Sequence, residues 1–298
     1  MIEIPFTKFD AAGNTWTVVA SDHLQFPPSP RAPAATARFR RLARALCRPR
    51  RGPASDGLLV ILPPEHARNL ACVRFFNADG SEAEMSGNGI RCAAAWLGSK
   101  TGRVRGMRLE TAAGLRVVSA GFAGSGSPHR ERGYIVRMGQ PILAPGKVPF
   151  HCGHQRGRIV GFPLPTRRGE IPVTVTSMGN PHCTLFVDGF ERMNWKKLGR
   201  EIELNPVFPN RTNVEFVRVI SRREIEVRFW ERGVGRTLSS GTGSCAAVVA
   251  GVLAGRTGRR VRVRTLAGSL EVAWPCGGEV RLAGPVRWVG SGVARFGG

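Results

Sequence analysis

Two short stretches of the sequence combine a serine, a glycine-rich loop and an alanine-rich run. The first reads SGNGIRCAAAW from Ser86, and the second reads SGTGSCAAVVA from Ser240. A glycine-rich loop that leads into a helix presents several backbone N–H groups, and the helix dipole adds partial positive charge at the same place. Such a loop binds a carboxylate or a phosphate, and it favours the anionic form of a side chain just before the helix. Both stretches therefore predict a site for a small anion.

The pair of loops suggests a reaction at a carbon atom that is approached from both sides. If the loops face each other across a cleft between domains, one group removes a proton from one face of the carbon while the other supplies a proton to the opposite face. Backbone N–H groups would stabilise the charge that develops on the substrate carboxylate. A single loop of this kind is also typical of a plain helix cap with a tight turn, so the hypothesis depends on there being two.

Both loops belong to a longer internal repeat. In each half a β-branched run leads to a Gly–Asn turn, in the first half Ile4–Thr7 and Gly13–Asn14, and in the second half Ile171–Thr174 and Gly179–Asn180. An asparagine in a strand-like segment follows, Asn77 and then Asn213, before each glycine loop. Because there are two copies in the same order, the repeat predicts two similar domains and not a solenoid.

Strands are expected to dominate the elements that position the loops. Alternating apolar and polar runs, separated by Gly, Pro and Ser, are typical of β-rich domains with hairpins. Helices are expected over residues 36–47, 88–101, 195–201 and 241–255, and a linker between the halves at residues 120–133. The length of 298 residues suits two domains of ordinary size.

The chain is strongly basic, with 44 Lys and Arg against 21 Asp and Glu and a formal net charge of +23. Seven arginines lie in residues 38–51, where Phe39, Leu42, Ala43 and Leu46 recur at helical spacing. This segment predicts an amphipathic helix with an arginine-rich solvent face. Such a charge attracts polyanions, but no stacking pattern of aromatic residues accompanies the arginines. We interpret the basicity as surface composition, with nucleic-acid binding as the alternative.

Cysteine usage and hydropathy indicate a cytoplasmic protein without bound metal. The seven cysteines are scattered and form no CxxC pair, which argues against a disulfide framework and against a structural zinc site. His151, Cys152 and His154 lie close in sequence, but three such residues in one loop do not by themselves make a metal site. No run approaches the roughly 18 apolar residues of a membrane span, and the first residues lack the apolar core of a signal peptide. We expect a soluble protein with no membrane partner.

Longer motifs carry a family resemblance. The segments FFNADGSEAEMSGNGIRC and WERGVGRTLSSGTGSCAA, with GNPH and RTNVEF between them, closely resemble the diaminopimelate epimerase family. The resemblance extends from FTKFDAAGNTWTVV almost to the C-terminus. It implies an α/β (α+β) fold of two pseudo-symmetric domains, each a β-barrel-like sheet around a central helix. We expect one domain over residues 1–131, joined by a C-terminal strand at residues 286–298, and a second domain over residues 132–285.

The resemblance also implies an activity and a partner. The family interconverts LL- and meso-diaminopimelate, a precursor of lysine and peptidoglycan, without a cofactor, and its members often form homodimers. The expected partner is therefore a small amino acid with a distal carboxylate. We do not expect nucleic acid as a partner despite the high positive charge.

Several residues match positions that have roles in the family. The asparagines that hold the amino and carboxylate groups of the substrate match Asn14, Asn77, Asn180 and Asn213. The Glu–Arg pair, in which the arginine grips the distal carboxylate, matches Glu231 and Arg232. The loop residues whose amides hold the reacting carboxylate match Gly87, Asn88, Gly241 and Thr242. The groups that assist the two acid/base residues match His182 and Glu231. Taken one by one, these residue types are equally typical of turns, loops and surface pairs.

The sequence departs from the family at the two residues that carry the chemistry. In the family both acid/base residues are cysteines, and here their positions are held by Ser86 and Ser240. Cys92 and Cys245 follow the loops at helix positions and do not replace them. A thiol has an ordinary pKa of roughly 8.5, which falls beside a helix N-terminus, whereas a serine hydroxyl needs an adjacent base. The chain should therefore bind substrate but epimerise it poorly.

Three explanations for the serines stay open, and the candidate catalytic residues are Ser86, Ser240, His182 and Glu231. One is an epimerase whose cysteines were replaced deliberately to trap substrate. Another is a divergent racemase or dehydratase of the same fold, and the third is a basic binding protein that has lost catalysis. Two identical changes at only these positions favour the first. Arg236, where the family often has Glu, and the GPASDG loop at residues 52–57 favour the other two.

Overall fold

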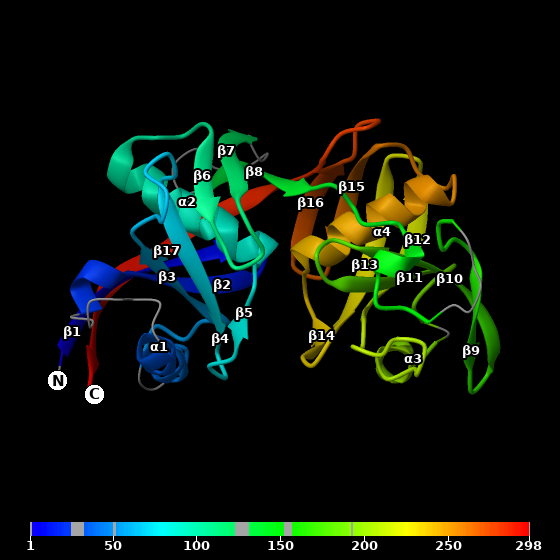
Figure 1. Ribbon diagram of the computed structural model, residues 1–298, viewed down its shortest axis with the longest axis horizontal. Helices are drawn as coiled ribbons and strands as arrows, with labels where there is room; N and C mark the ends of the chain where they lie inside the picture. Colours follow the sequence, from blue (N-terminus) through cyan, green and yellow to red (C-terminus); the bar gives the residue numbers. More distant parts are fainter. Residues whose placement is uncertain are drawn as a thin grey trace. The chain divides into compact units, whose positions relative to one another are not determined.

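Two compact units make up the chain. The computed structural model describes residues 2–24, 33–49, 52–122, 131–151, 157–191 and 193–297. Unit 1 comprises Met1–Arg137 with Ala283–Gly298, and unit 2 comprises Met138–Leu282 (Figure 1). The first division lies near the end of strand β8 (Glu131–Gly139), which pairs with β7 (Arg116–Phe122) of unit 1.

The same pairing corrects the expected linker at residues 120–133. Its central residues 123–130 lie outside the described part, but its two ends belong to β7 and β8, which pair antiparallel within unit 1. The segment therefore connects two neighbouring strands of one unit. Its Gly- and Ser-rich composition is typical of a hairpin connection as much as of a linker between domains.

A closed ring of strands forms unit 1. The remaining members are β1 (Ile2–Ala11), β2 (Asn14–Ala20), β3 (Gly57–Leu62), β4 (Ala71–Asn77), β6 (Met107–Glu110) and β17 (Val280–Phe296). Each pairs with the next in the order β1, β2, β3, β4, β6, β7, β8, β17, and β17 pairs back with β1. A two-residue strand, β5 (Glu82–Ala83), adds to β4. The register of β1 and β17 places Ile2 opposite Phe296, so the two described ends of the chain lie side by side.

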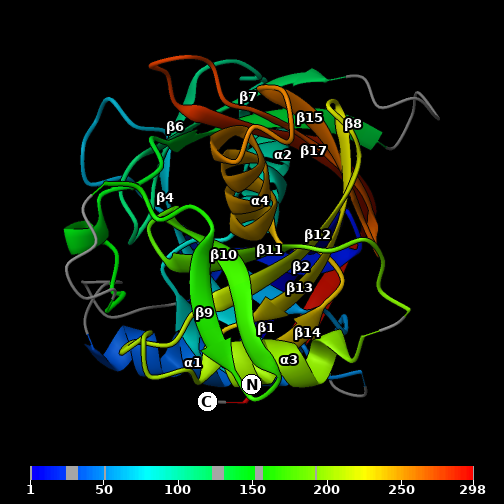
Figure 2. The ribbon, with the colours of Figure 1, turned by 90° about the vertical axis from the view of Figure 1, so that its right-hand side faces the viewer.

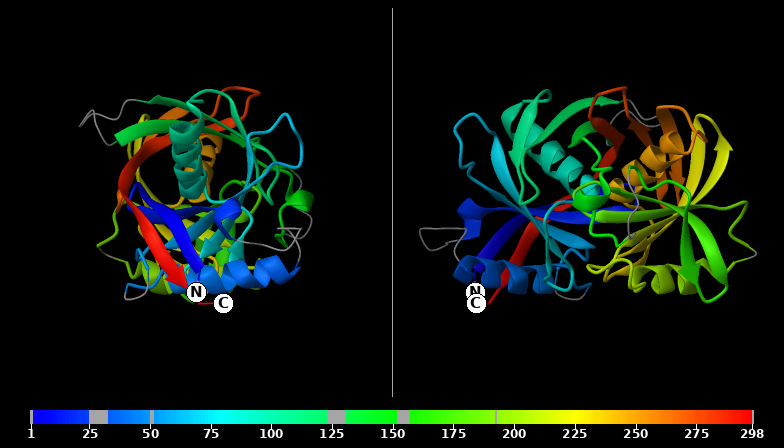
Figure 3. Two further views of the ribbon diagram at one scale, coloured as in Figure 1. Left: turned by 90° about the vertical axis from the view of Figure 1, so that its left-hand side faces the viewer. Right: turned by 45° about the vertical axis from the view of Figure 1, so that its right-hand side comes forward.

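Two helices of different character belong to this ring. Helix α2 (Gly87–Thr101) contacts β1, β2, β3, β4 and β7 from inside, and its first two turns are buried on all sides (Figure 3, left). Helix α1 (Pro33–Leu46) packs outside against β3 and β4. Its buried residues include Phe39, Leu42 and Leu46, which confirms the amphipathic helix expected from the sequence. A short 3₁₀ helix, η1 (Ser21–Leu24), follows β2.

Unit 2 surrounds its own central helix with strands. They are β9 (Phe162–Thr166), β10 (Gly169–Ser177), β11 (Pro181–Phe186), β12 (Asn213–Ser221), β13 (Glu224–Glu231), β14 (Gly235–Thr237), β15 (Arg260–Thr265) and β16 (Gly268–Ala273). They pair in the order β9, β10, β11, β12, β13, β15, β16, with β14 also on β13. Helix α4 (Gly241–Leu253) lies within them, and α3 (Trp195–Glu203) packs against β12, β13 and β14 (Figure 2). A 3₁₀ turn, η2 (Pro145–Lys147), precedes β9.

The predicted repeat is present in the pairing of the strands. In unit 1, β2 runs parallel to β3 and β4 parallel to β6, and in unit 2 the corresponding pairs β11–β12 and β13–β15 are also parallel. The helices follow the same order, because α1 and α3 occupy one equivalent place and α2 and α4 another. The two strand asparagines are not equivalent, however. Asn77 ends β4, whose counterpart β13 ends at Glu231, whereas Asn213 begins β12.

Free thiols and hydropathy complete the description. Five of the six cysteines that the structure describes are buried, and Cys276 is exposed. Cys152 and His154 lie outside the described residues. Among the described helices none is both long and apolar enough to cross a membrane.

Candidate active site

Ser86 and Ser240 occupy the same structural position, the N-cap of the helix inside each unit. Ser86 has extended backbone angles (φ −129°, ψ 125°), and its Oγ accepts a hydrogen bond from Gly89 N at 3.1 Å. Ser240 is nearly identical (φ −137°, ψ 126°), and its Oγ accepts from Gly243 N at 3.3 Å. Each oxygen therefore lies in the positive field of a helix N-terminus, where an anionic oxygen or sulfur is favoured.

The second glycine of each SGxG motif, Gly89 or Gly243, lets its helix lie close to the strands. A Cβ at Gly243 would lie 2.9 Å from Phe229 Cδ1 and 3.0 Å from Glu215 Oε1, and a Cβ at Gly89 would lie 3.0 Å from Phe75 Cδ1. These separations are shorter than ordinary carbon contacts. The sequence SGxG thus has a packing role as well as a chemical one, because it seats the N-terminus of the helix against β12 and β13 in unit 2.

A buried guanidinium supports the start of α2. Arg91 is fully buried, and it donates to Gly87 O at 2.9 Å and to Asn88 Oδ1 at 3.0 Å. Its positive charge therefore lies within the first turn of the helix that Ser86 caps. The burial of Arg91 was not predicted from the sequence, although the residue stands within the motif GNGIRC.

In unit 1 the predicted asparagines lie at the same end of the strand ring. Asn14 begins β2, and Asn77 ends β4; between them, the register pairs Trp16 with Gly57 and Gly57 with Asn77. Asn14 Oδ1 accepts from Trp16 Nε1, and Asn77 Nδ2 donates to the Ser81 hydroxyl at 2.9 Å. Gly89, in the first turn of α2, packs on Phe75, which precedes Asn77 by two residues in β4. This end of the strand ring therefore lies close to the N-terminus of α2.

In unit 2 a buried chain of polar groups centres on His182. Its Nδ1 lies 2.7 Å from Glu215 Oε1, and its Nε2 lies 2.9 Å from Asn180 Oδ1. Both His182 and Glu215 are almost completely buried. Each ring nitrogen of His182 therefore has a hydrogen-bond partner, Glu215 on one side and Asn180 on the other. Burial raises the pKa of Glu215, and the neighbouring His182 and Thr184 partly offset that rise.

Glu215 was not among the residues selected from the sequence. It lies two residues after Asn213 on β12, so strand alternation places both side chains on the same face of the strand. The parallel register then puts Asn213 beside His182 and Glu215 beside Thr184. The motif RTNVEF could have revealed Glu215 through this alternation, but only once the partner strand was known.

Glu231 and Arg232 lie at the end of β13, next to the start of β12. Glu231 is partly buried and accepts a hydrogen bond from Thr237 Oγ1 at 2.6 Å. Burial raises the pKa of its carboxyl, Thr237 and the charge of His182 lower it, and the charge of Glu215 raises it. The side chain of Arg232 is exposed and donates to Asn210 O at 3.1 Å. Asn213 fixes the backbone here, because its Oδ1 accepts from Arg232 N at 3.0 Å and its Nδ2 donates to Pro181 O at 2.9 Å.

The remaining helix cysteines have surroundings that suppress reactivity. Cys92 lies in α2 and Cys245 in α4, and both are completely buried. Burial raises the pKa of the Cys92 thiol far above its ordinary value. Neither thiol can therefore take the place of Ser86 or Ser240 at a helix N-terminus.

Comparison with known proteins decides the family. The family model described as Diaminopimelate epimerase matches residues 13–142 and 174–289. The chain belongs to the diaminopimelate epimerase family. Relatives named diaminopimelate epimerase include the protein of Pelotomaculum thermopropionicum, 42% identical over 289 residues that cover 96% of this chain and 97% of the relative. The protein of Desulfitobacterium hafniense is 41% identical over 288 residues, 96% of each chain.

Solved structures confirm the diaminopimelate epimerase-like fold. A hydroxyproline epimerase from Agrobacterium vitis with bound trans-4-hydroxy-L-proline gives a TM-score of 0.66 at 17% identity, covering 98% of this chain and 92% of that one. A predicted epimerase from Pseudomonas aeruginosa gives a TM-score of 0.65 at 17% identity and covers 99% of this chain and 100% of its own. At such identities the likeness concerns the fold alone.

Proposed function

We propose that this protein is a cofactor-independent scaffold of the diaminopimelate epimerase type, which binds LL- and meso-diaminopimelate and transfers the α-proton slowly. The observation that carries the proposal is the pair of equivalent helices, α2 and α4, each capped by a serine. By the family motifs, these caps correspond to the two acid/base cysteines. Family membership supplies the substrate class, and the capped helices supply two groups in equivalent positive fields.

Binding depends on the groups around the two helix N-termini. We assign the reacting carboxylate to the backbone N–H groups of Gly87 and Asn88 at the start of α2, and of Gly241 and Thr242 at the start of α4, because a helix N-terminus favours an anion. Arg232 has an exposed guanidinium that makes no ion pair with any residue the structure describes, so it is free to take the distal carboxylate. We assign hydrogen bonds to the amino and carboxylate groups of the substrate to Asn14 and Asn77 in unit 1 and to Asn180 and Asn213 in unit 2.

Proton transfer is where the serines limit the protein. A serine hydroxyl at a helix N-cap loses its proton far less readily than a thiol does, so it is a poor base for removing the α-proton. His182, held by Glu215, and Glu231 are the neighbouring groups that can assist. Because general acid–base catalysis contributes about 10²–10⁴-fold to a rate, the loss of two well-matched groups should leave binding intact and reaction slow.

The test is α-proton exchange in D₂O, followed by NMR with LL-diaminopimelate. Exchange and formation of the meso form should be at least about 10²-fold faster in the double variant Ser86→Cys, Ser240→Cys than in the unaltered protein. A control with thiols at two exposed positions, Ser99→Cys and Ser291→Cys, should react like the unaltered protein. No exchange in any form would reject the proposed substrate, and exchange with proline-type amino acids instead would favour a divergent racemase.

Two further changes in the double-cysteine background test the assigned roles. Arg232→Met should weaken substrate binding about tenfold or more, because it removes a charge-assisted contact. Arg168→Met, at an exposed turn between β9 and β10, removes the same charge and should have no effect. Glu215→Gln should lower the exchange rate without changing substrate affinity, since Glu215 acts through His182. Unchanged affinity in Arg232→Met would refute the role of that arginine.

A further inference from the structure

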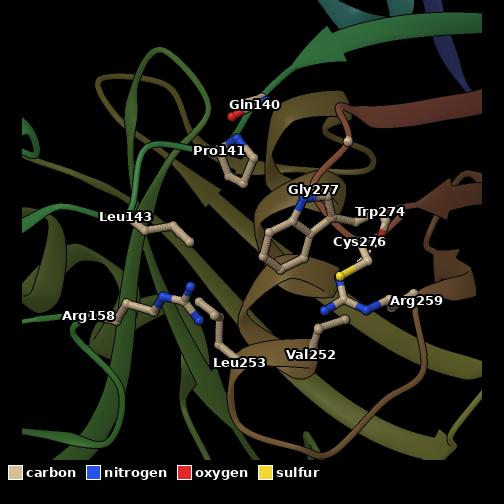
Figure 4. Close-up of a pocket in the computed structure, with 11 residues that line it drawn as sticks. Gln140, Pro141, Leu143, Arg158, Val252, Leu253, Arg259, Trp274, Cys276 and Gly277 are labelled. Atoms are coloured by element: carbon tan, nitrogen blue, oxygen red, sulfur yellow. Dashed lines mark hydrogen bonds between the residues drawn. The ribbon is translucent and has the colours of Figure 1, made fainter.

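A pocket of about 370 Å³ lies in unit 2 at the C-terminal end of α4 (Figure 4). Val252 and Leu253, the last residues of the helix, form part of its wall. At 1.5 Å per residue they lie roughly 18 Å along the helix from Ser240. The pocket is therefore separate from the proposed active site, and the inference drawn from it does not rest on the proposed function.

Apolar surface and positive charge share the wall of this pocket. The apolar part is formed by Pro141, Leu143, Val252, Leu253 and the indole of Trp274. The charged part is formed by Arg158 and Arg259, whose guanidinium groups approach the pocket from opposite sides (Figure 4). None of the described residues that line the pocket is acidic. The two positive charges thus have no counter-charge in the wall.

Arg259 is held in place by the hairpin of β15 and β16. Trp274 N donates to Arg259 O at 2.7 Å, and Arg259 Nη1 donates back to Trp274 O at 3.2 Å. The guanidinium also lies over the indole ring, 5.2 Å from its centroid. A guanidinium fixed in this way loses little conformational entropy when a ligand binds, which favours affinity.

Arg158 supplies the second charge without competition from a neighbour. Its side chain is exposed, and it makes neither an ion pair nor a hydrogen bond with another residue in the described part of the chain. An arginine in this state is available for a bidentate bond to a planar oxyanion such as a carboxylate. Arg158 and Arg259, on opposite sides of the pocket, can together bind one anionic group or two.

The end of the helix does not repel an anion here, because its carbonyl groups are already bonded. Ala250 O accepts from Ala254 N at 2.9 Å, and Gly251 O accepts from Arg256 N at 2.8 Å. Val252 O accepts from Gly255 N at 3.1 Å. The partial negative charge that a bare helix C-terminus would present is thereby reduced.

We propose that this pocket binds a small organic anion with a flat apolar body, of the aromatic carboxylate class. The carboxylate pairs with Arg158 and Arg259, and the flat body lies between the indole of Trp274 and the aliphatic side chains. At about 30 Å³ for each water-sized group, the volume holds roughly a dozen such groups, which suits a two-ring molecule. A bare phosphate would leave the apolar wall unused.

Cys276 provides a local reporter for the test. It lines the pocket and is exposed, whereas the other described cysteines are buried. The rate of its alkylation by iodoacetamide, measured by peptide mass spectrometry, should fall in a saturable way as 2-naphthoate is added. The neutral amide 2-naphthamide should protect at least about tenfold less well, because it lacks the charge that the arginines recognise.

Matched variants separate the pocket from general charge effects. Arg158→Gln and Arg259→Gln should each raise the naphthoate concentration needed for protection by about tenfold, with unchanged circular dichroism. Arg168→Gln, which removes one exposed charge elsewhere, and Arg232→Met in the proposed active site should leave protection unchanged. Equal protection by the amide or by inorganic phosphate would overturn the proposal. So would an equal loss of protection in Arg168→Gln.

Discussion

At the scale of single residues, the site in unit 2 depends on how buried carboxyl groups are partnered. Glu215 fixes the ring of His182 through a 2.7 Å contact, and Asn180 holds the other ring nitrogen. A buried ionisable group is tolerated only where such partners exist. Glu231 has a weaker arrangement, since its 2.6 Å bond from Thr237 is to a neutral hydroxyl. The two carboxyl groups should therefore respond differently to pH.

Replacing Glu231 with Gln should change how stability depends on pH. Burial raises the pKa of Glu231 in the folded protein, so its favourable contribution is present below its unfolded pKa of roughly 4.3 and is lost as the pH rises through the folded value. Glu231→Gln cannot ionise and keeps the oxygen that Thr237 bonds. Relative to the unaltered protein, Glu231→Gln should gain unfolding free energy between pH 4 and pH 7. The gain should be about 1.4 kcal/mol for each unit by which the folded pKa of Glu231 exceeds its unfolded pKa.

Urea denaturation at several pH values measures this difference. Thr237→Val is the complementary variant, because it removes the hydrogen bond that lowers the pKa of Glu231. It should enlarge the loss of stability with rising pH, and that enlargement should vanish when Glu231→Gln is added. Parallel pH profiles for the unaltered protein and Glu231→Gln would show that the raised pKa is absent.

At the scale of elements, the two serines serve the helices that they cap. Each Oγ satisfies one backbone N–H that the first turn of a helix leaves without an intrahelical partner. Oxygen is the preferred N-cap acceptor, and sulfur accepts hydrogen bonds weakly. The serines are thus good caps of α2 and α4, and if thiols stand at these positions in the family, as the sequence motifs predict, stability and reactivity oppose each other there.

Cap variants should show this opposition in unfolding experiments. Ser86→Ala and Ser240→Ala should each lower the unfolding free energy by about 1 kcal/mol, and Ser86→Cys and Ser240→Cys by a similar or smaller amount. Ser99→Ala, near the C-terminal end of α2, is the control: an exposed alanine there should be neutral or slightly stabilising. Cysteine variants more stable than the serine forms would contradict a capping role.

At the scale of the whole molecule, local patterns predicted much of the architecture. The spacing of Phe39, Leu42 and Leu46 gave α1, and the repeated order of turn, strand and glycine loop gave two units with equivalent helices. The ring of unit 1 could not be predicted from local patterns. It closes where β17, near the C-terminus, pairs with β1, near the N-terminus, and Arg287 donates to Asp10 Oδ2 at 3.0 Å. No local periodicity encodes a pairing between segments so far apart in sequence.

The same distinction applies to the site. Ser86, Ser240, His182 and Glu231 stand in motifs and were selected from the sequence, whereas Glu215 and Arg91 act through contacts that depend on folding. Glu215 becomes recognisable only when β11 lies parallel to β12 and brings His182 beside it. Pocket residues Arg158 and Trp274 belong to no motif, and the fold alone brings them together.

The net charge of +23 should make the stability of the whole molecule sensitive to salt. Repulsion among uncompensated basic groups disfavours the compact state, and the screening length falls from about 30 Å at 0.01 M to about 8 Å at 0.15 M salt. We therefore expect the unfolding free energy to rise by an amount on the order of 1 kcal/mol over this range. The exposed ion pairs weaken in salt, but each contributes little.

The double variant Arg40→Gln, Arg41→Gln, on the solvent face of α1, should raise stability at low salt and reduce the salt effect. A fall in urea midpoint with added NaCl would show that ion pairs outweigh repulsion.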